Sequence, residues 1–192
     1  KYSSVPVING LSDFLHPCQA VADFYTMYEK RGFLKGLRLV YIGDSNNVSN
    51  SLMMASAKTG VHMTICSPRG YEPNVDIMNW YNQDAPATGS TFKLTSDPVE
   101  AVRDADFIYT DVWASMGQEK EAEERKAIFA PYQVNAQLMS KAPKQAMVLH
   151  CLPAHRGEEI TDEVVDSVQS VVFDEAENRL HAQKAIMALL MA

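Results

Sequence analysis

The chain has 192 residues, of which 46% are hydrophobic and 21% charged, and its formal net charge is −7. This composition is ordinary for a globular domain, and the acidic balance disfavours a nucleic-acid partner because no basic stripe offsets it. No apolar run approaches the roughly 18 residues that a membrane-spanning helix needs, so we expect no membrane-embedded part.

Three cysteines, Cys18, Cys66 and Cys151, are an odd number and lack CxxC spacing. This usage is typical of reduced thiols, and we therefore expect a cytoplasmic protein, or a mitochondrial matrix protein if the source is eukaryotic. The chain opens on Lys1 rather than on methionine, and no cationic leader precedes an apolar stretch. The start on Lys1 predicts a truncated or excised chain.

The first predicted element is a helix within residues 10–30, with Asp13 as its cap and Pro17 among its early positions, where proline is accepted. Its apolar face comprises Ala20, Val21, Phe24 and Met27. We expect this helix to enter the main domain from elsewhere in the protein.

Downstream, short apolar runs alternate with helical patterns. Five strands are predicted at residues 37–42, 62–66, 107–112, 146–149 and 171–173, with a further short strand at residues 91–94. Helices are predicted at residues 47–58, 75–83, 98–102 (after an Asp97 cap), 119–129 and 175–191. This alternation predicts an α/β fold, in which a Rossmann-like, doubly wound, mostly parallel five-stranded sheet is flanked by helices.

A polar run, Gly43-Asp44-Ser45-Asn46-Asn47, follows the first strand and precedes a helix. Ligands bind at the carboxyl ends of strands in such sheets, and helix amino termini favour anions. The run is not a GxGxxG dinucleotide motif. The Asn47 amide both donates and accepts, which suits the charged groups of an amino acid; the alternative is a helix cap with an Asx turn.

A second candidate, Asp111-Val112-Trp113-Ala114-Ser115-Met116-Gly117, lies at the end of a predicted strand. An acidic side chain there can hold a ligand ammonium, and the Ser-Met-Gly piece is flexible enough to close over it. The alternative is that Asp111 only caps the next turn.

The run from His150 to Gly157 contains a thiol, two imidazoles and a guanidinium. Two generic interpretations are a zinc site and a thiolate activated by histidine. Both are disfavoured, since His150 and Cys151, as neighbours on a strand, should point to opposite faces.

Two further candidates lie on helices. His16 and Gln19 are spaced i, i+3, so that they share one helix face and together can hydrogen-bond one carbonyl group. Arg179 follows acidic residues at a helix start and suits a phosphate or a carboxylate. The alternatives are a surface His and Gln, and a solvent-exposed Glu175–Arg179 pair.

These sites, in this order, resemble the ornithine carbamoyltransferase branch of the aspartate/ornithine transcarbamylase family. Residues 9–19 resemble its His-Pro-x-Gln motif, residues 150–154 resemble its ornithine-type signature, and residues 111–117 resemble its loop that closes over ornithine. The resemblance covers essentially all 192 residues and implies its carboxy-terminal, ornithine-binding part.

The resemblance implies transfer of a carbamoyl group from carbamoyl phosphate to the δ-amine of ornithine, giving citrulline and phosphate with neither a cofactor nor a metal. It assigns carbamoyl phosphate to His16, Gln19, Cys151, Leu152 and Arg179. It assigns ornithine to Leu11, Asn47, Asp111, Ser115, Met116, Cys151 and Leu152. Of these, His16, Gln19, Asp111, Cys151 and Arg179 would act in catalysis, with Cys151 as a binding group rather than a nucleophile.

The resemblance also implies three parts. Residues 1–30 would be a remnant of a carbamoyl-phosphate domain with a linking helix, residues 31–178 the ornithine-binding domain, and residues 179–192 a helix returning towards the first domain. The family's Ser-x-Arg-Thr-Arg phosphate loop does not occur in the sequence. We therefore expect the chain alone to be inactive, and the family's homotrimer to be in doubt for it.

Two alternatives remain open at this point. One is an enzyme that carbamoylates putrescine or another amine, although the Ser-Met-Gly element favours ornithine. The other is a non-catalytic, ornithine-binding fragment, which the absent phosphate loop favours.

Overall fold

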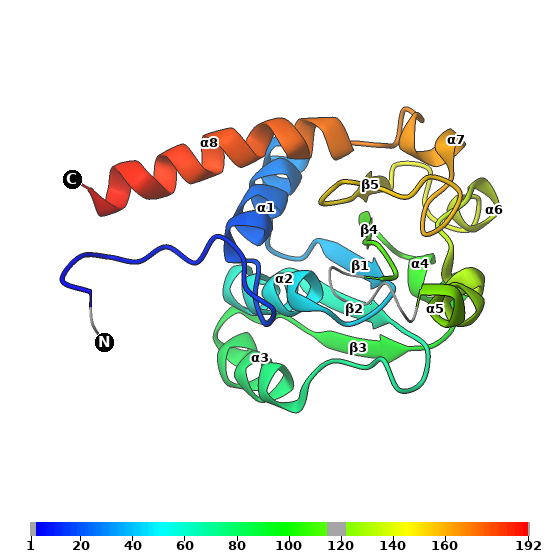
Figure 1. Ribbon diagram of the computed structural model, residues 1–192, viewed down its shortest axis with the longest axis horizontal. Helices are drawn as coiled ribbons and strands as arrows, with labels where there is room; N and C mark the ends of the chain where they lie inside the picture. Colours follow the sequence, from blue (N-terminus) through cyan, green and yellow to red (C-terminus); the bar gives the residue numbers. More distant parts are fainter. Residues whose placement is uncertain (1–2, 115–121, 192) are drawn as a thin grey trace.

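The computed structural model of the protein describes residues 3–114 and 122–191. Its strands form one parallel sheet in the order β3-β2-β1-β4-β5 (Figure 1). The strands are β1 (Arg38–Ile42), β2 (His62–Cys66), β3 (Phe92–Thr95), β4 (Phe107–Thr110) and β5 (Met147–Leu149). This confirms the predicted α/β class and the five-stranded, doubly wound sheet.

Helices connect the strands and cover both faces of the sheet. They are α1 (Pro17–Arg31), α2 (Asn47–Thr59), α3 (Val75–Thr88), α4 (Pro98–Val102), α5 (Ala122–Phe129), the 3-10 turn η2 (Ala130–Tyr132), α6 (Ala136–Met139), α7 (Asp162–Val165) and α8 (Val172–Leu190). Helix α3 runs five residues beyond the predicted end at Gln83, through Pro86, and stops at Gly89, whose φ of 80° is a left-handed conformation suited to glycine.

The alternation of side chains along the strands divides the core in two. Leu39 and Tyr41 of β1 face the cluster that packs under α1, α2 and α3. Val40 and Ile42 face the opposite cluster, under α4, α6 and α7. Period-two alternation with apolar residues on both faces is what a parallel sheet covered on both sides requires.

Two sequence predictions of local structure are wrong. Residues 171–173 form no strand; Val172 instead opens helix α8 and packs in the second core cluster. The fifth strand of the sheet is the short one at Phe92–Thr95. Asp13 does not cap α1, because His16 occupies the cap position and Pro17 begins the helix.

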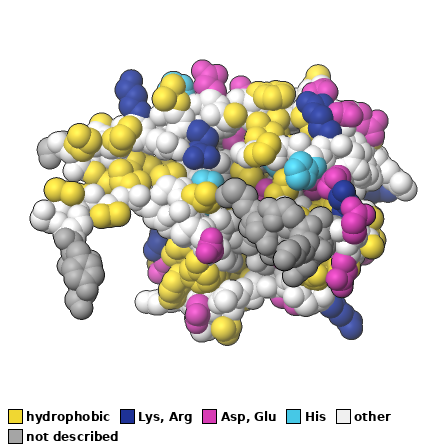
Figure 2. All heavy atoms as spheres, viewed as in Figure 1, with side chains coloured by type: hydrophobic (Ala, Val, Ile, Leu, Met, Phe, Trp, Pro, Cys, Tyr) yellow, Lys and Arg dark blue, Asp and Glu magenta, His cyan; other side chains and the backbone are white. Residues whose placement is uncertain are grey.

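Helices α1 and α8 pack against each other at one end of the sheet, and the outer half of α8 projects beyond it (Figure 1). Apolar side chains gather on this projecting part and on the neighbouring amino-terminal segment (Figure 2). Among them are Val7, Leu180 and Leu189, which are strongly exposed. No helix of the described residues combines the length and the apolar character that crossing a membrane requires.

Candidate active site

Polar side chains converge where β1, β4 and β5 end. The chain leaves β1 towards β2 on one side and returns to β4 on the other, so a topological switch point lies between β1 and β4. Asn46, after β1, donates from Nδ2 to Oδ2 of Asp111, after β4, at 2.6 Å. Cys151, after β5, donates from Sγ to Oδ1 of Asp111 at 3.1 Å. Asp111 is therefore the meeting point of three strand ends.

Asp111 is a buried carboxylate, 6% exposed. Besides Asn46 and Cys151, it accepts a hydrogen bond from the backbone N–H of Val112 at 2.8 Å. Within residues 3–114 and 122–191, no lysine, arginine or histidine forms an ion pair with it. A buried carboxylate that has only uncharged donors is a good site for a cationic group, because an ion pair offsets the cost of its burial.

The two asparagines before α2 have different tasks. Asn46 is the cap of the helix, since its Oδ1 accepts from the N–H groups of Val48 and Ser49. Asn47 is the first helical residue, and its Nδ2 donates to the carbonyl oxygen of Ser12 at 2.8 Å. The predicted Asx cap is thus found one residue earlier than Asn47, and the residue that contacts Asp111 is Asn46.

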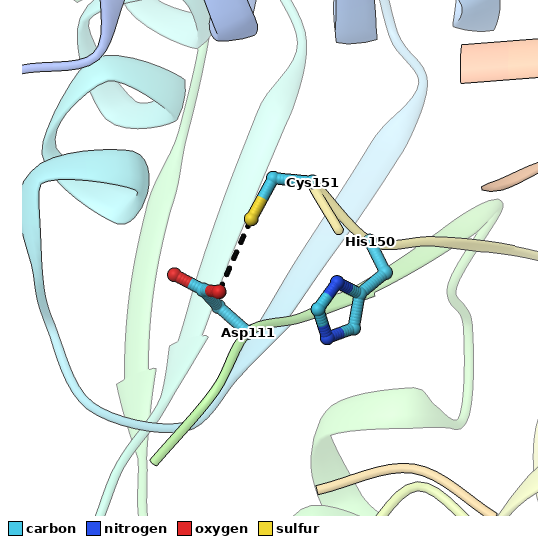
Figure 3. Close-up of side chains that lie close together, drawn as sticks. All are labelled: Asp111, His150 and Cys151. Atoms are coloured by element: carbon cyan, nitrogen blue, oxygen red, sulfur yellow. Dashed lines mark hydrogen bonds between the residues drawn. The ribbon is translucent and has the colours of Figure 1, made fainter. Parts of the chain in front are cut away.

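The expected geometry at His150 and Cys151 is wrong. β5 ends at Leu149, so neither residue lies on a strand, and ligand atoms of Asp111, His150 and Cys151 lie within 4.8 Å of one another. Figure 3 shows the Cys151 side chain directed at Asp111. The His150 ring accepts at Nδ1 from the Leu152 N–H (2.9 Å) and contacts Glu159 through Nε2 (3.0 Å). Since both ring nitrogens are engaged, the trio does not fit a metal.

Cys151 is a neutral thiol in this setting. Burial raises the pKa of Cys151 well above its ordinary value, and the neighbouring Asp111 carboxylate raises it further. A thiol that stays protonated is a poor nucleophile, while its S–H can donate a weak hydrogen bond, as it does to Asp111. The geometry therefore supports a binding role for Cys151 and argues against the thiolate interpretation.

Leu152 continues this turn in a left-handed conformation, with φ of 54°, before a cis bond to Pro153. Such a φ costs a branched residue roughly 1–2 kcal/mol, and residues held this way cluster at functional sites. The side chain is half-buried beside Cys151.

A second group of predicted residues lines a cavity of about 470 Å³ between the amino-terminal segment and α8. Leu11, His16 and Arg179 contribute to its wall, together with Cys18 and Gln183. Nδ1 of His16 is buried and has no partner among the described residues. Burial, and after it the Arg179 charge, lower the pKa of His16, so the imidazole is neutral at neutral pH. Asp111, Asn47 and Cys151 do not line this cavity.

Gln19 lies beneath the cavity and is 1% exposed. Its Oε1 accepts from the Arg179 guanidinium. Its Nε2 donates to Asp23 Oδ1 at 2.7 Å and to Glu175 Oε1 at 3.1 Å. His16 and Gln19 are both near Arg179, as an i, i+3 pair on one helix face allows.

Several residues at the site were missed by the sequence interpretation. Arg125 is 4% exposed, pairs with Asp44, donates to the Trp113 carbonyl, and stacks over the rings of Tyr71 and Phe129. The buried acids Asp23, Glu159 and Glu175 were likewise not singled out as functional.

Ser115 and Met116 lie outside the described residues, so their predicted role in binding ornithine is untested.

The chain matches two family models. One is the Asp/Orn binding domain of aspartate/ornithine carbamoyltransferase, over residues 35–190, and the other is the carbamoyl-P binding domain of the same family, over residues 1–29. It is 61% identical over 191 residues to ornithine carbamoyltransferase of Thermococcus kodakarensis, covering 100% of this chain and 61% of that protein.

Solved structures agree with this match. Ornithine carbamoyltransferase from Pyrococcus furiosus superposes with a TM-score of 0.95 at 60% identity, over 99% of this chain and 61% of that one. The enzyme from Gloeobacter violaceus gives a TM-score of 0.92 at 48% identity, over 100% of this chain and 64% of that one. The chain thus spans about 60% of the length of the curated relatives it matches.

Proposed function

Because the chain belongs to the aspartate/ornithine carbamoyltransferase family, we propose that the natural protein transfers a carbamoyl group from carbamoyl phosphate to the δ-amine of ornithine. The products are citrulline and phosphate. The observation that carries the choice of an amine substrate with a second, charged amino group is the buried Asp111 carboxylate, which lies at the switch point and has only uncharged donors among the described residues. The similarity to ornithine carbamoyltransferases supports ornithine among such amines. An α-ammonium group supplies the missing cation.

The ornithine side of the site is assigned to Leu11, Asn47, Asp111, Cys151 and Leu152, with Ser115 and Met116 from the segment outside the described residues. Asp111 pairs with the α-ammonium, while Asn47 holds the α-amino and carboxylate end. Cys151 and Leu152 lie near the attacking amine. The raised pKa of Cys151 supports its role as an uncharged wall of the pocket.

The carbamoyl side is assigned to His16, Gln19 and Arg179, together with Cys151 and Leu152. The buried, unpartnered Nδ1 of His16 and the nearby Arg179 guanidinium support this assignment. A neutral imidazole can donate one hydrogen bond to the carbamoyl oxygen, and the guanidinium stabilises negative charge that develops there.

In the reaction, the lone pair of the neutral δ-amine forms a bond to the carbamoyl carbon. The bond from that carbon to the phosphate oxygen breaks, and phosphate leaves with the electron pair. The new amide nitrogen loses a proton, which the departing phosphate takes up. Catalysis comes from holding the two substrates together and from donors aimed at the developing oxyanion. No covalent intermediate on Cys151 is involved.

A citrulline assay on the natural full-length protein, with ornithine and carbamoyl phosphate, tests this function. Citrulline formation that depends on both substrates is expected, and no citrulline at saturating substrates would contradict it. The 192 residues alone are expected to give no turnover, since they lack a Ser-x-Arg-Thr-Arg run. Robust turnover by this chain alone would show that its own residues suffice for phosphate binding.

The assembly and the compartment are further parts of the proposal. A homotrimer, implied by the family resemblance, is tested by light scattering on the full-length protein. The three free cysteines support a reducing compartment such as the cytoplasm.

A further inference from the structure

Two carboxyl groups are buried face to face between α1 and α8, beneath the predicted carbamoyl site. Asp23 and Glu175 are each 0% exposed, and both lie on one donor, since Gln19 Nε2 donates to Asp23 Oδ1 at 2.7 Å and to Glu175 Oε1 at 3.1 Å. Two acids in contact cannot both be ionised without strong repulsion, so such pairs retain a proton. The mechanism proposed above uses neither group.

Within the described part of the chain, the surroundings of the pair include the Arg179 guanidinium and several hydrogen-bond donors. The groups that face it are Gln19 from α1, Arg179 from α8, Tyr109 from β4, and the His150 N–H and Cys151 from the turn after β5. Burial raises the pKa of Asp23 to about 7 and that of Glu175 well above its ordinary value. Because the two groups interact, these values describe the pair, and the hydrogen bonds decide which oxygen carries the proton.

The hydrogen bonds place the proton on Asp23. Glu175 accepts at both oxygens: Oε1 from Gln19 Nε2 (3.1 Å) and Tyr109 Oη (3.2 Å), and Oε2 from the His150 N–H (2.9 Å). Asp23 accepts from Gln19 at Oδ1, but its Oδ2 is buried and has no hydrogen-bond partner among the described residues. Oδ2 is therefore the oxygen free to carry a proton and donate it to Glu175.

The contacts of the pair explain what it does. Both carboxyls accept from the Gln19 Nε2, and this leaves the Gln19 Oε1 directed at Arg179. Glu175 also holds the backbone N–H of His150, one residue before Cys151. The Asp23–Glu175 pair thus fixes Gln19, which is assigned to carbamoyl phosphate, and also the turn that carries Cys151, which is assigned to both substrates.

We infer that Asp23 and Glu175 form a positioning pair that shares one proton, with Asp23 as donor and Glu175 as acceptor, and that this pair sets the orientation of Gln19 and the His150–Cys151 turn for carbamoyl transfer. The inference rests on the proposed function. It adds two positioning residues that touch neither substrate.

Amide substitutions test the assignment because they differ in which hydrogen-bond pattern they preserve. In Asp23→Asn, the new Nδ2 replaces the protonated Oδ2 and still donates to Glu175, while Oδ1 still accepts from Gln19. In Glu175→Gln, the new NH2 group must face either the His150 N–H or the Gln19 Nε2. Both of these are donors, so one hydrogen bond is lost. Glu177→Gln, an exposed acid two positions along the same helix, is the matched control.

In the full-length protein, we expect D23N and E177Q to keep kcat close to wild type and E175Q to lose on the order of 100-fold, as misplaced reacting groups do. Loss of kcat in D23N with retention in E175Q would overturn the assignment, as would equal behaviour of E175Q and E177Q. Circular dichroism shows whether each variant is folded.

Infrared spectra decide the matter even if E175Q does not fold or no variant turns over. At mildly acidic pH, below the raised pKa of Asp23, the wild-type protein should show the C=O stretch of a protonated, buried carboxyl, and the band should vanish in D23N and persist in E177Q. A band that persists in D23N would place the proton on Glu175 and overturn the inference. If the wild type makes no citrulline, the proposed function fails, while this spectral comparison still tests the pair.

Discussion

The Cys151 thiol donates a hydrogen bond to Asp111 Oδ1 across 3.1 Å and so joins the carboxyl end of β5 to that of β4. Because Asn46 holds the other carboxylate oxygen, Asp111 is fixed from both sides. A carboxylate held in this way is preorganised for a ligand ammonium group, which is the basis of the substrate assignment.

Replacing Asp111 with Asn should weaken ornithine binding selectively. The substitution keeps the shape and removes the negative charge, and losing one partner of a desolvated ion pair costs about 2–5 kcal/mol. We expect KM for ornithine to rise by at least on the order of 30-fold, the ratio that about 2 kcal/mol gives, with KM for carbamoyl phosphate little changed. Steady-state kinetics measures both.

Asp104→Asn is the matched control, since Asp104 is an exposed acid just before the other end of β4. It should leave both KM values unchanged. Equal effects of D111N and D104N on ornithine would show that Asp111 does not contact this substrate.

Cys151 should resist alkylation while the protein is folded. Burial and the Asp111 charge raise the pKa of its thiol, so the reactive thiolate is scarce at pH 8. Mass spectrometry after iodoacetamide treatment should show little label on Cys151 in the native protein and full label after unfolding in urea. Cys151→Ser should retain turnover; its complete loss, with the fold intact, would favour a nucleophilic role.

Stability should depend on pH through Asp23. Its pKa is raised from 3.8 to about 7 on folding, so the folded state holds a proton that the unfolded state has lost. This contribution is fully present below pH 4 and is lost as the pH rises through 7. Urea unfolding should therefore show the wild type losing, relative to D23N, on the order of 2 kcal/mol between pH 5 and 8. If the free energy of unfolding changed with pH in the same way in the wild type and in D23N, the pKa of Asp23 would not be raised.

The sheet was largely predictable because β1, β2, β4 and β5 are short runs rich in apolar residues. Residues 171–173 were not, since a three-residue apolar run has no period that separates a strand from the start of a buried helix. The structure resolves this case through packing: Val172 is buried against the second core cluster as the first residue of α8.

The candidate site was only partly predictable. Asp111, Cys151 and Asn47 stood out because they follow strands. However, choosing Asn46 over Asn47 as the contact of Asp111 requires knowing where α2 begins. Asp23 and Glu175 come from opposite ends of the chain, and no local pattern relates them; only the packing of α1 on α8 brings them together.

Arg125 pairs with Asp44, which lies far from it in sequence, and should be a major contributor to stability. Burial raises the pKa of Asp44 and the Arg125 charge lowers it, so removing Arg125 leaves a largely buried acid without its cation. Arg125→Met should lower the free energy of unfolding by about 3–5 kcal/mol. Urea denaturation measures this change.

Arg125→Lys keeps the charge but loses the planar group that stacks on Tyr71 and Phe129, so an intermediate loss is expected. Arg69→Met, at an exposed position near Tyr71, should have little effect. If R125M and R69M were equally stable, the Arg125–Asp44 pair would make no net contribution to the free energy of unfolding.

Competition between two amines tests the central claim most directly. Ornithine and putrescine differ by the α-carboxylate, and both offer an amine to carbamoyl phosphate. The natural full-length protein, given equal concentrations of both with carbamoyl phosphate, should yield almost only citrulline by mass spectrometry. Carbamoylputrescine in excess over citrulline would contradict the assignment of this site to ornithine.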